Sequence, residues 1–543
     1  MAASYGAPGV YIEERPSGTM SIEGVGTAVA AFVGLTETYN VADGDPTDPT
    51  GVKPQLVTSW PQYERVYGGF VPGAMLPHAV RGFFDNGGTA AYIVRMPTSQ
   101  DTDGPATVTL PAADKSGVDS LTVSALEVGS RVEVEVVAPL PDPPQAEGQE
   151  SGNGADANHA YTLLVYADGT LCEELGPLQF TAKTPRTVER AVNERSKYIQ
   201  VEMTAAAQGV ALADRAPAAG RYPLEAPVAS AVSITPADLE GSVTDRTGYR
   251  GLAIAENVTM VAIPDLVTVA TGADGRLDEE VFLGAQKQLV DWCETSRTRM
   301  AILDPPPGLN ATRVLEWRAR LARDSAFAAF YYPNLVVANP LARPGATNGD
   351  LFLTVPPSGH VAGVWARTDA SRGVWKAPAN ESLRGIARLE TEVTTGEQDL
   401  LNPEGINCVR SFGTYGTKVW GARTLAKTDP SWRYINVRRL FNFVEESIRR
   451  GTQWAVFEPN DLDLWQRVKR NISAFLRGMW MQGALVGTTA EQAFYVLCDE
   501  SNNPQSSVDE GKLIVEVGIA PVKPAEFVIF RISQWQGGGA ANE

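Results

Sequence analysis

Short apolar runs alternate with helical patterns along this chain, and a long stretch of different composition interrupts them. Residues 27–35 (TAVAAFVGL) are mostly apolar and bounded by turn residues, which predicts a buried strand. Residues 73–86 carry apolar side chains at helical spacing before Gly87, which is placed to end the helix, and residues 90–96 form a second apolar run. Strand, helix and strand in this order predict a parallel α/β unit.

The same alternation resumes after residue 250. Asp278 is placed to cap one helix and Ser358 to cap another. The patterns predict strands at 258–263, 299–303 and 326–332 and helices at 278–295 and 312–323. Residues 27–97 and 251–400 are therefore expected to form one α/β core domain that an insertion divides.

The insertion, residues 98–250, has a composition of its own. Short β-like runs alternate there with turns rich in Pro, Gly and Asp. The insertion contains 11 basic and 22 acidic residues, so its net charge is −11. This pattern predicts a separate, acidic and mostly β domain.

The part of the chain after residue 400 reads as an α+β domain over 401–525. One helix is expected from an Asn436 cap to Arg450, with Glu445–Arg449 and Glu446–Arg450 pairs, and a longer one over 461–480. Strands are expected at 493–498, 512–517 and 526–532. Residues 406–480 hold 13 basic and 6 acidic residues, a net charge of +7 in a chain whose net charge is −18.

The sequence contains no arrangement that points to catalysis or metal binding. The four cysteines (172, 293, 408, 498) and three histidines (78, 159, 360) are scattered, without a C-x-x-C or H-E-x-x-H motif. Residues 413–418 (GTYGTK) superficially resemble a phosphate-binding loop, but they lie between two β-like runs and predict a hairpin turn. We therefore expect no enzyme activity, no cofactor and no metal.

Charge and hydropathy exclude other classes of partner. The net charge of −18 disfavours binding to nucleic acid, whose phosphates require a basic surface. No apolar stretch approaches 18 residues, so no membrane insertion is expected. The N-terminus lacks the pattern of a secretory signal, which favours folding in a cytoplasm. The function class that these observations favour is a structural or interaction protein.

Several strings, in order along the chain, resemble the contractile tail sheath proteins. They are residues 8–14 (PGVYIEE), 27–34, 355–380 (VPPSGHVAGVWARTDASRGVWKAPAN), 401–424 (LNPEGINCVRSFGTYGTKVWGART), 434–460 (YINVRRLFNFVEESIRRGTQWAVFEPN) and 520–532 (APVKPAEFVIFRI). The resemblance covers about the first hundred residues and nearly everything after residue 251, whereas 98–250 resembles nothing that we can name.

The resemblance implies a subunit of the sheath around the inner tube of a myophage, an R-type pyocin or an extracellular contractile injection system. Such subunits form stacked hexameric rings in the bacterial cytoplasm, bind inner tube, baseplate and tail terminator or cap proteins, and drive the tube through a target envelope on contraction. The family also implies that 98–250 faces outward and that the C-terminal domain faces the tube. Two alternatives are a type VI secretion-like sheath component and a Rossmann-like nucleotide-using enzyme; the latter would need a Gly-rich strand-to-helix turn, which is absent.

Two groups of residues are the candidate sites. Extended arms at 1–26 and 526–543 are expected to exchange strands between subunits, through Val10, Tyr11, Ile12 and Glu13 and through Glu526, Phe527, Val528, Ile529, Phe530, Arg531 and Ile532. Basic residues expected to face an acidic tube are Arg449, Arg450, Arg467, Lys469, Arg470 and Arg477.

Overall fold

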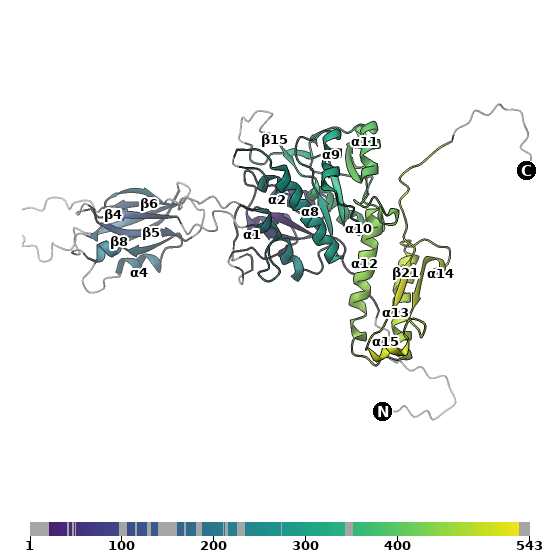
Figure 1. The fold of residues 1–543 in the computed structure, drawn as a ribbon. Helices are drawn as coiled ribbons and strands as arrows, with labels where there is room; N and C mark the ends of the chain where they lie inside the picture. Colours follow the sequence, from purple (N-terminus) through teal and green to yellow (C-terminus); the bar gives the residue numbers. More distant parts are fainter. Residues whose placement is uncertain are drawn as a thin grey trace, which may run out of the picture. The chain divides into compact units, whose positions relative to one another are not determined.

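The computed structural model describes residues 21–531, apart from 41–42, 46–47, 49, 97–105, 114–116, 127–131, 139–159, 168–169, 181–186, 210, 212–214, 225–233, 273 and 343–350 (Figure 1). The described residues fall into two compact units. One lies within Met1–Asp45, Gly51–Arg95 and Thr235–Glu543, and the other within Pro46–Thr50 and Met96–Ile234.

The first unit is built on a nine-stranded sheet in the order β16-β19-β18-β13-β12-β11-β1-β3-β2. The six central strands are parallel, and antiparallel strands flank them on both sides. The bounds are β1 Val29–Gly34, β2 Gln55–Val57, β3 Ala90–Arg95, β11 Met260–Ala262, β12 Met300–Leu303, β13 Ala328–Tyr332, β16 Glu381–Ser382, β18 Ile406–Ser411 and β19 Thr417–Val419. The parallel pairing of β1 with β3 confirms the α/β unit expected at the start of the chain.

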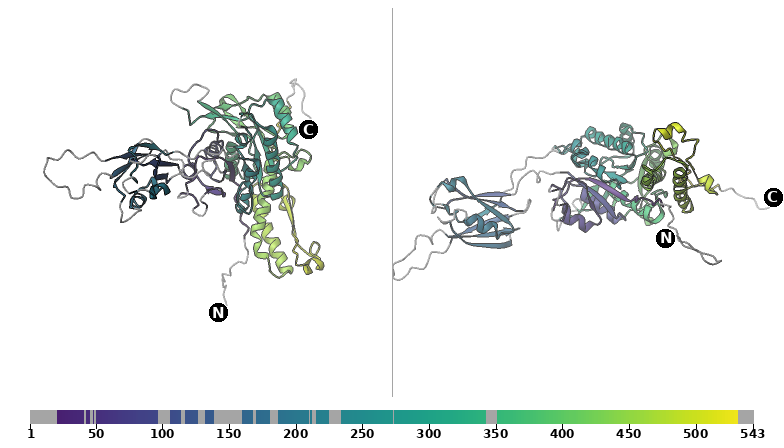
Figure 2. Two further views of the ribbon diagram at one scale, coloured as in Figure 1. Left: turned by 60° about the vertical axis from the view of Figure 1, so that its left-hand side comes forward. Right: turned by 90° about the horizontal axis from the view of Figure 1, so that it is seen from below.

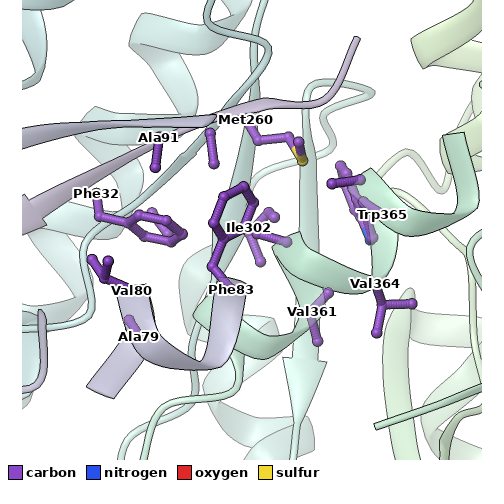
Figure 3. Packing of buried hydrophobic residues seen from close by; sticks show 14 of the residues in the cluster. Phe32, Ala79, Val80, Phe83, Ala91, Met260, Ile302, Val361, Val364 and Trp365 are labelled. Carbon is purple, nitrogen blue, oxygen red and sulfur yellow. The ribbon is translucent and has the colours of Figure 1, made fainter. Parts of the chain in front are cut away.

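Helices cover both faces of this sheet. Helices α1 (Trp60–Tyr67), α2 (Leu76–Asp85) and α10 (Ser358–Arg372) bury their apolar residues against one face, where Phe32, Met260 and Ile302 project (Figure 3). Buried residues of opposite parity, such as Val33, Val261 and Leu303, face the other side, next to α8 (Glu279–Ser296) and α9 (Ala311–Leu321). Shorter elements complete the unit: α6 Pro236–Glu240, α7 Leu266–Val269, α11 Thr395–Leu401, and the three-stranded sheet of β14 Leu335–Ala338, β15 Phe352–Val355 and β17 Arg388–Leu389.

Helices α2 and α10 are in close backbone contact through glycines. Gly359 and Gly363 lie one turn apart on α10, and a Cβ at either would overlap a backbone carbonyl oxygen of α2, that of Ala79 or of Phe83. Trp365 on the same helix is fully buried and donates from Nε1 to the Tyr331 hydroxyl at 2.9 Å. The core is therefore closed to any added methyl group at this contact.

Two expected helix caps are wrong, and the reasons are similar. Ser358 is the first residue of α10, and its amide donates to Asp304 Oδ1 at 2.8 Å, so a carboxyl at the end of β12 holds the helix start. Burial raises the pKa of Asp304 to about 7. Asn436 lies inside α12 (Ile435–Gly451), whose N-cap is Tyr434. The side-chain amide of Asn436 donates through Nδ2 to the backbone carbonyls of Trp375 and Val522. Each cap residue had been assigned from its local sequence, whereas its partner lies far along the chain.

The second unit is β-rich. Antiparallel strands β4 (Thr107–Pro111), β5 (Asp119–Ala125) and β9 (Ile199–Met203) form one sheet, and β6 (Val132–Val137), β7 (Tyr161–Ala167), β8 (Thr170–Leu178) and β10 (Gly220–Pro223) form another. Helices α4 (Thr187–Asn193) and α5 (Ala205–Gln208) accompany them, around a core that includes Val134, Leu163 and Val201.

The unit boundaries differ from those expected from sequence. The second unit ends at Ile234 rather than near residue 250, because α6 packs beside α8 and the Tyr249 ring lies 5.1 Å from that of Trp292. The central sheet continues past residue 400, because β18 pairs with β13.

After the sheet, two antiparallel helices form the C-terminal layer with a small sheet. Helix α12 is followed by α13 (Leu462–Met481), which begins after an Asp461 cap, and the two run side by side (Figure 2). Strands β20 (Phe494–Leu497) and β21 (Glu516–Ile519) pair antiparallel, with α14 Ala490–Ala493 and α15 Gln505–Asp509 beside them. Trp465, Val468, Ile472 and Met479 of α13 are buried, and Phe475 is partly buried against the same cluster.

Candidate assembly interface

The chain leaves the C-terminal layer as an exposed apolar segment. After β21, Pro521 forms a bridge with Leu485, and residues 522–531 form no helix or strand within this chain. Phe527, Val528, Ile529 and Phe530 are 71%, 69%, 79% and 82% exposed. Four adjacent large apolar side chains in water mark an interaction site, and their β propensity suits an added strand. The segment matches most of the predicted C-terminal exchange residues, whereas Ile532 lies outside the described residues.

Glu526, directly before that segment, is held by three side chains. Arg423 donates from Nε at 2.8 Å and from Nη2 at 2.6 Å, Asn402 from Nδ2 at 2.7 Å, and the Tyr434 hydroxyl at 3.0 Å. Burial alone would raise the pKa of Glu526, but hydrogen bonds from Arg423 and Asn402 lower it below its ordinary value. We call Glu526, Arg423, Asn402 and Tyr434 the Glu526 clamp.

The small sheet that precedes this segment along the chain has open edges. Within the part of the chain that the structure describes, β20 and β21 pair with each other and form a sheet of two strands. Val496 and the neighbouring apolar side chains pack on α13. On the other face the Tyr495 hydroxyl donates to Glu516 Oε1 at 2.6 Å, and its ring occupies the space that a Cβ at Gly518 would need. A two-stranded sheet with unpaired backbone edges can accept further strands.

The first described residues of the chain lie along α12. Ile22 is buried in the apolar cluster of the C-terminal layer, and the Val25 amide donates to Ser447 Oγ at 3.2 Å. Gly24 lies against the Phe443 ring, with too little space for a Cβ. The N-terminal arm is thus anchored from Ile22 onward, while Val10–Glu13 lie outside the described residues.

A buried ion pair joins α12 to the α/β core at the same place. Arg439 Nη2 lies 2.6 Å from Asp369 Oδ2, and the two side chains are 3% and 4% exposed. Thr27 donates its hydroxyl to Asp369 and accepts from Arg439 through its carbonyl. One pair therefore fixes α10, α12 and the end of the N-terminal segment together.

Three of the six candidate tube-facing residues are paired within the chain. Arg449 and Arg450 both contact Glu446, and both lie near Glu256 of the core. Burial would raise the pKa of Glu446, but hydrogen bonds from Arg449 and Arg450 lower it. The Glu446–Arg450 pair was expected, whereas Glu445 pairs with Arg438 instead of Arg449. Arg467 pairs with Glu458 and Asp463.

The other three lie on α13 without such partners. Arg470 and Arg477 are exposed and lie two turns apart on one side of the helix, and Lys469 is half-buried. None of the three forms an ion pair with a residue that the structure describes. Arg477 nevertheless helps to lower the pKa of Glu491, and Lys469 that of Asp499, so these two charges are partly compensated within the chain.

The described residues contain no group of three or more His, Cys, Asp or Glu side chains that could hold a metal ion. No helix within the same ranges is long and apolar enough to cross a membrane. The hairpin expected around 413–418 is confirmed, since β18 and β19 flank it in antiparallel register.

Open sheet edges and the exposed apolar segment 527–530 are features typical of a protein that assembles with other chains. Two family models match the chain: the phage tail sheath protein central domain over residues 264–425 and the phage tail sheath C-terminal domain over 427–534. Residues 264–425 and 427–534 are thus similar to the two domains of the tail sheath family, as the sequence motifs had indicated. This family consists of structural proteins, which excludes the nucleotide-using enzyme.

Curated relatives and solved structures agree. The tail sheath protein of Vibrio phage KVP40 is 31% identical over 177 residues, which cover 32% of this chain and 26% of that protein. The putative prophage major tail sheath protein of Pseudomonas aeruginosa strain UCBPP-PA14 is 30% identical over 189 residues, 33% of this chain and 47% of that protein. The chain thus matches less than half the length of either relative. The helical sheath of the anti-feeding prophage, solved in the contracted state, is 26% identical with a TM-score of 0.54, over 98% of this chain and 100% of that one.

Proposed function

We propose that this chain is the repeating subunit of a contractile sheath, which polymerises as stacked hexameric rings around an inner tube. On contraction the sheath drives the tube through a target envelope. The observation that carries the proposal is that one chain contains both an exposed apolar segment, 527–530, and a two-stranded sheet with open edges. The likeness to an anti-feeding prophage sheath over nearly the whole chain supports it.

Strand exchange links the subunits in this proposal. Val10–Glu13 of one copy and Glu526–Ile532 of another add to β20–β21 of a third, so that main-chain hydrogen bonds hold the partners and alternate side chains fill pockets. Because the arms are joined to the body through short segments, rings can rotate and slide while they stay linked. Strain stored at assembly supplies the work, so no nucleotide is needed.

The other surfaces have roles in the same assembly. The C-terminal layer faces the tube, with Lys469, Arg470 and Arg477 the basic residues best placed to meet an acidic surface. The acidic β-rich unit faces outward and is dispensable for polymerisation. Replacing it by a short Gly/Ser linker should leave sheath assembly intact, and loss of assembling soluble protein would refute this placement.

Electron microscopy of the purified full chain tests the proposal. We expect helically striated tubes from the full chain and folded, unassembled protein after deletion of residues 1–15 or truncation after Lys523. Truncation after Gln536, which keeps the whole exchange segment, is the matched control and should still form tubes. Sheaths of normal length from either arm deletion would show that the arms are not the couplings.

The particle is a phage tail, a bacteriocin or an injection device assembled in a bacterial cytoplasm, with baseplate and terminator or cap proteins as further partners. The matches to phage tail and anti-feeding prophage sheaths do not favour the type VI alternative. Capsid and terminase genes beside this one would indicate a phage, and their absence a bacteriocin or injection system.

A further inference from the structure

The exchanged segment has a competitor within its own chain. Backbone pairing with the same chain continues past β21 to Val522, whose amide donates to the Ala484 carbonyl at 3.3 Å. Four residues, 523–526, then precede Phe527, enough to turn back and pair the segment with an open edge of its own β20–β21 sheet. A strand tethered by so short a linker has an effective concentration in the millimolar range. Such self-pairing would close the sheet that a neighbour should fill, so a subunit built for exchange needs a feature that prevents it.

We propose that the Glu526 clamp is this feature: it fixes the root of the exchange segment to the α/β body, which keeps residues 527–531 off their own sheet and available to another copy. This inference rests on the proposed sheath function and assigns Glu526 a positioning role within it. Glu526 had been expected only as the first residue of the exchanged strand.

The receiving side of the clamp is rigid. The Arg423 amide donates to Asn407 Oδ1 at 2.7 Å, which ties Arg423 to β18, and Arg423 also forms a bridge with Tyr434 at the start of α12. The Arg423 and Glu526 side chains are 11% and 19% exposed, so water competes little for their hydrogen bonds. Four hydrogen bonds on one carboxylate hold it far more firmly than a surface ion pair would.

The stretch that leads to the clamp is loosely packed. Residues 522–528 border an open groove of about 1130 Å³, and Trp375, Trp420 and Asn436 are among its other lining residues. Apart from the Asn436 bond to the Val522 carbonyl, the side-chain hydrogen bonds to described residues 522–531 converge on Glu526. Release of this carboxylate would therefore free residues 523–531 together.

The test uses the full chain with Glu526→Gln, which keeps the side chain's size but removes its charge and replaces one acceptor oxygen by an NH₂ facing the donors. Glu500→Gln is the matched control, because Glu500 is exposed and forms no ion pair with a described residue. Hydrogen exchange of residues 527–531 is measured by mass spectrometry on unassembled subunits, and sheath yield is measured by sedimentation and electron microscopy.

We expect these amides to exchange freely in the wild-type subunit and in Glu500→Gln, and to become protected in Glu526→Gln. Sheath yield of Glu526→Gln should fall about tenfold or more, since hydrogen bonds to a charged acceptor are stronger than those to a neutral one. Tyr434→Phe, which removes one donor and leaves Arg423 and Asn402, should shift both readouts in the same direction by less.

Wild-type sheath yield from Glu526→Gln, with residues 527–531 still unprotected, would overturn the clamp and leave the sheath function standing. Failure of the wild-type chain to form sheaths would instead contradict the proposed function. In that case the hydrogen exchange of the unassembled variants would still decide whether Glu526 keeps the segment off its own sheet.

Discussion

The contact between α2 and α10 and the end of the C-terminal layer represent opposite ways of building a surface. Gly359 and Gly363 bring two helix backbones so close that no methyl group fits between them. At the other end of the unit, Phe527 to Phe530 are exposed and β20–β21 has unpaired edges. The core buries its apolar side chains within one chain, whereas the C-terminal layer leaves apolar side chains and backbone edges exposed, features that are typical of a contact with another molecule.

The buried Arg439–Asp369 ion pair joins the α/β core to the C-terminal layer, and its loss should have the largest effect on the free energy of unfolding. Arg439→Leu would leave the Asp369 carboxylate buried without its partner, and we expect a loss of about 3–5 kcal/mol in the free energy of unfolding. Chemical denaturation of the unassembled chain measures it. Arg320→Leu is the control, because Arg320 pairs with Glu279 and Glu280 at an exposed position, and it should lose less than about 1 kcal/mol. Equal losses would mean that the junction is an ordinary surface pair.

The close contact between the α2 and α10 backbones predicts that a Gly→Ala substitution has opposite effects at two helical positions. Gly363→Ala places a methyl group against the Phe83 carbonyl and should destabilise the chain by about 1–3 kcal/mol. Gly284→Ala, in α8 with open space around it, should stabilise the chain by about 0.5–1 kcal/mol, because alanine is the better helix former. Thermal unfolding distinguishes the two. A stable Gly363→Ala variant would show that α10 can move off α2, contrary to the comparison.

A Phe→Ala substitution should lower the free energy of unfolding in the core but not in the exposed segment. Phe83→Ala removes a fully buried ring and should lower the free energy of unfolding by about 3–5 kcal/mol. Phe530→Ala, at a position 82% exposed, should change it by less than about 0.5 kcal/mol and yet reduce sheath formation. Denaturation and electron microscopy of both variants check this. Normal sheaths from Phe530→Ala would place the exchange contact elsewhere in the segment.

Local patterns predicted much of the α/β fold because its determinants are local. The apolar runs at β1, β3, β12 and β13 and the Asp278 cap were predicted from a few adjacent residues, and the structure contains them. Strand β2 and helix α1, in contrast, carry patterns too short to stand out. The caps at Ser358 and Asn436 were wrong because Asp304, Trp375 and Val522 provide partners that only the tertiary fold brings near.

The candidate interface divides in the same way. The β propensity of residues 526–531 is visible in the sequence, and it pointed to the segment that the structure leaves exposed. The Glu526 clamp was missed because Arg423, Asn402 and Tyr434 lie 103, 124 and 92 residues away. The count of +7 over 406–480 likewise could not distinguish the arginines that are paired within the chain from those that are not.

The arginines of α13 that are not paired within the chain should have the smallest effect on stability when they are replaced. Reversing Arg470 and Arg477 to Glu should leave thermal unfolding unchanged, since both are exposed and form no ion pair with a described residue, but should weaken co-assembly with an acidic tube. The loss should be larger at low salt than at high salt, because exposed charges are screened over a Debye length of about 8 Å at physiological ionic strength.

Reversing Arg449 and Arg450 is the matched control: it breaks their pairs with Glu446 and should lower the unfolding temperature. Co-sedimentation of sheath and tube at several salt concentrations measures the first effect. Unchanged co-assembly of the Arg470 and Arg477 variant at every salt concentration would mean that this side of α13 does not face the tube.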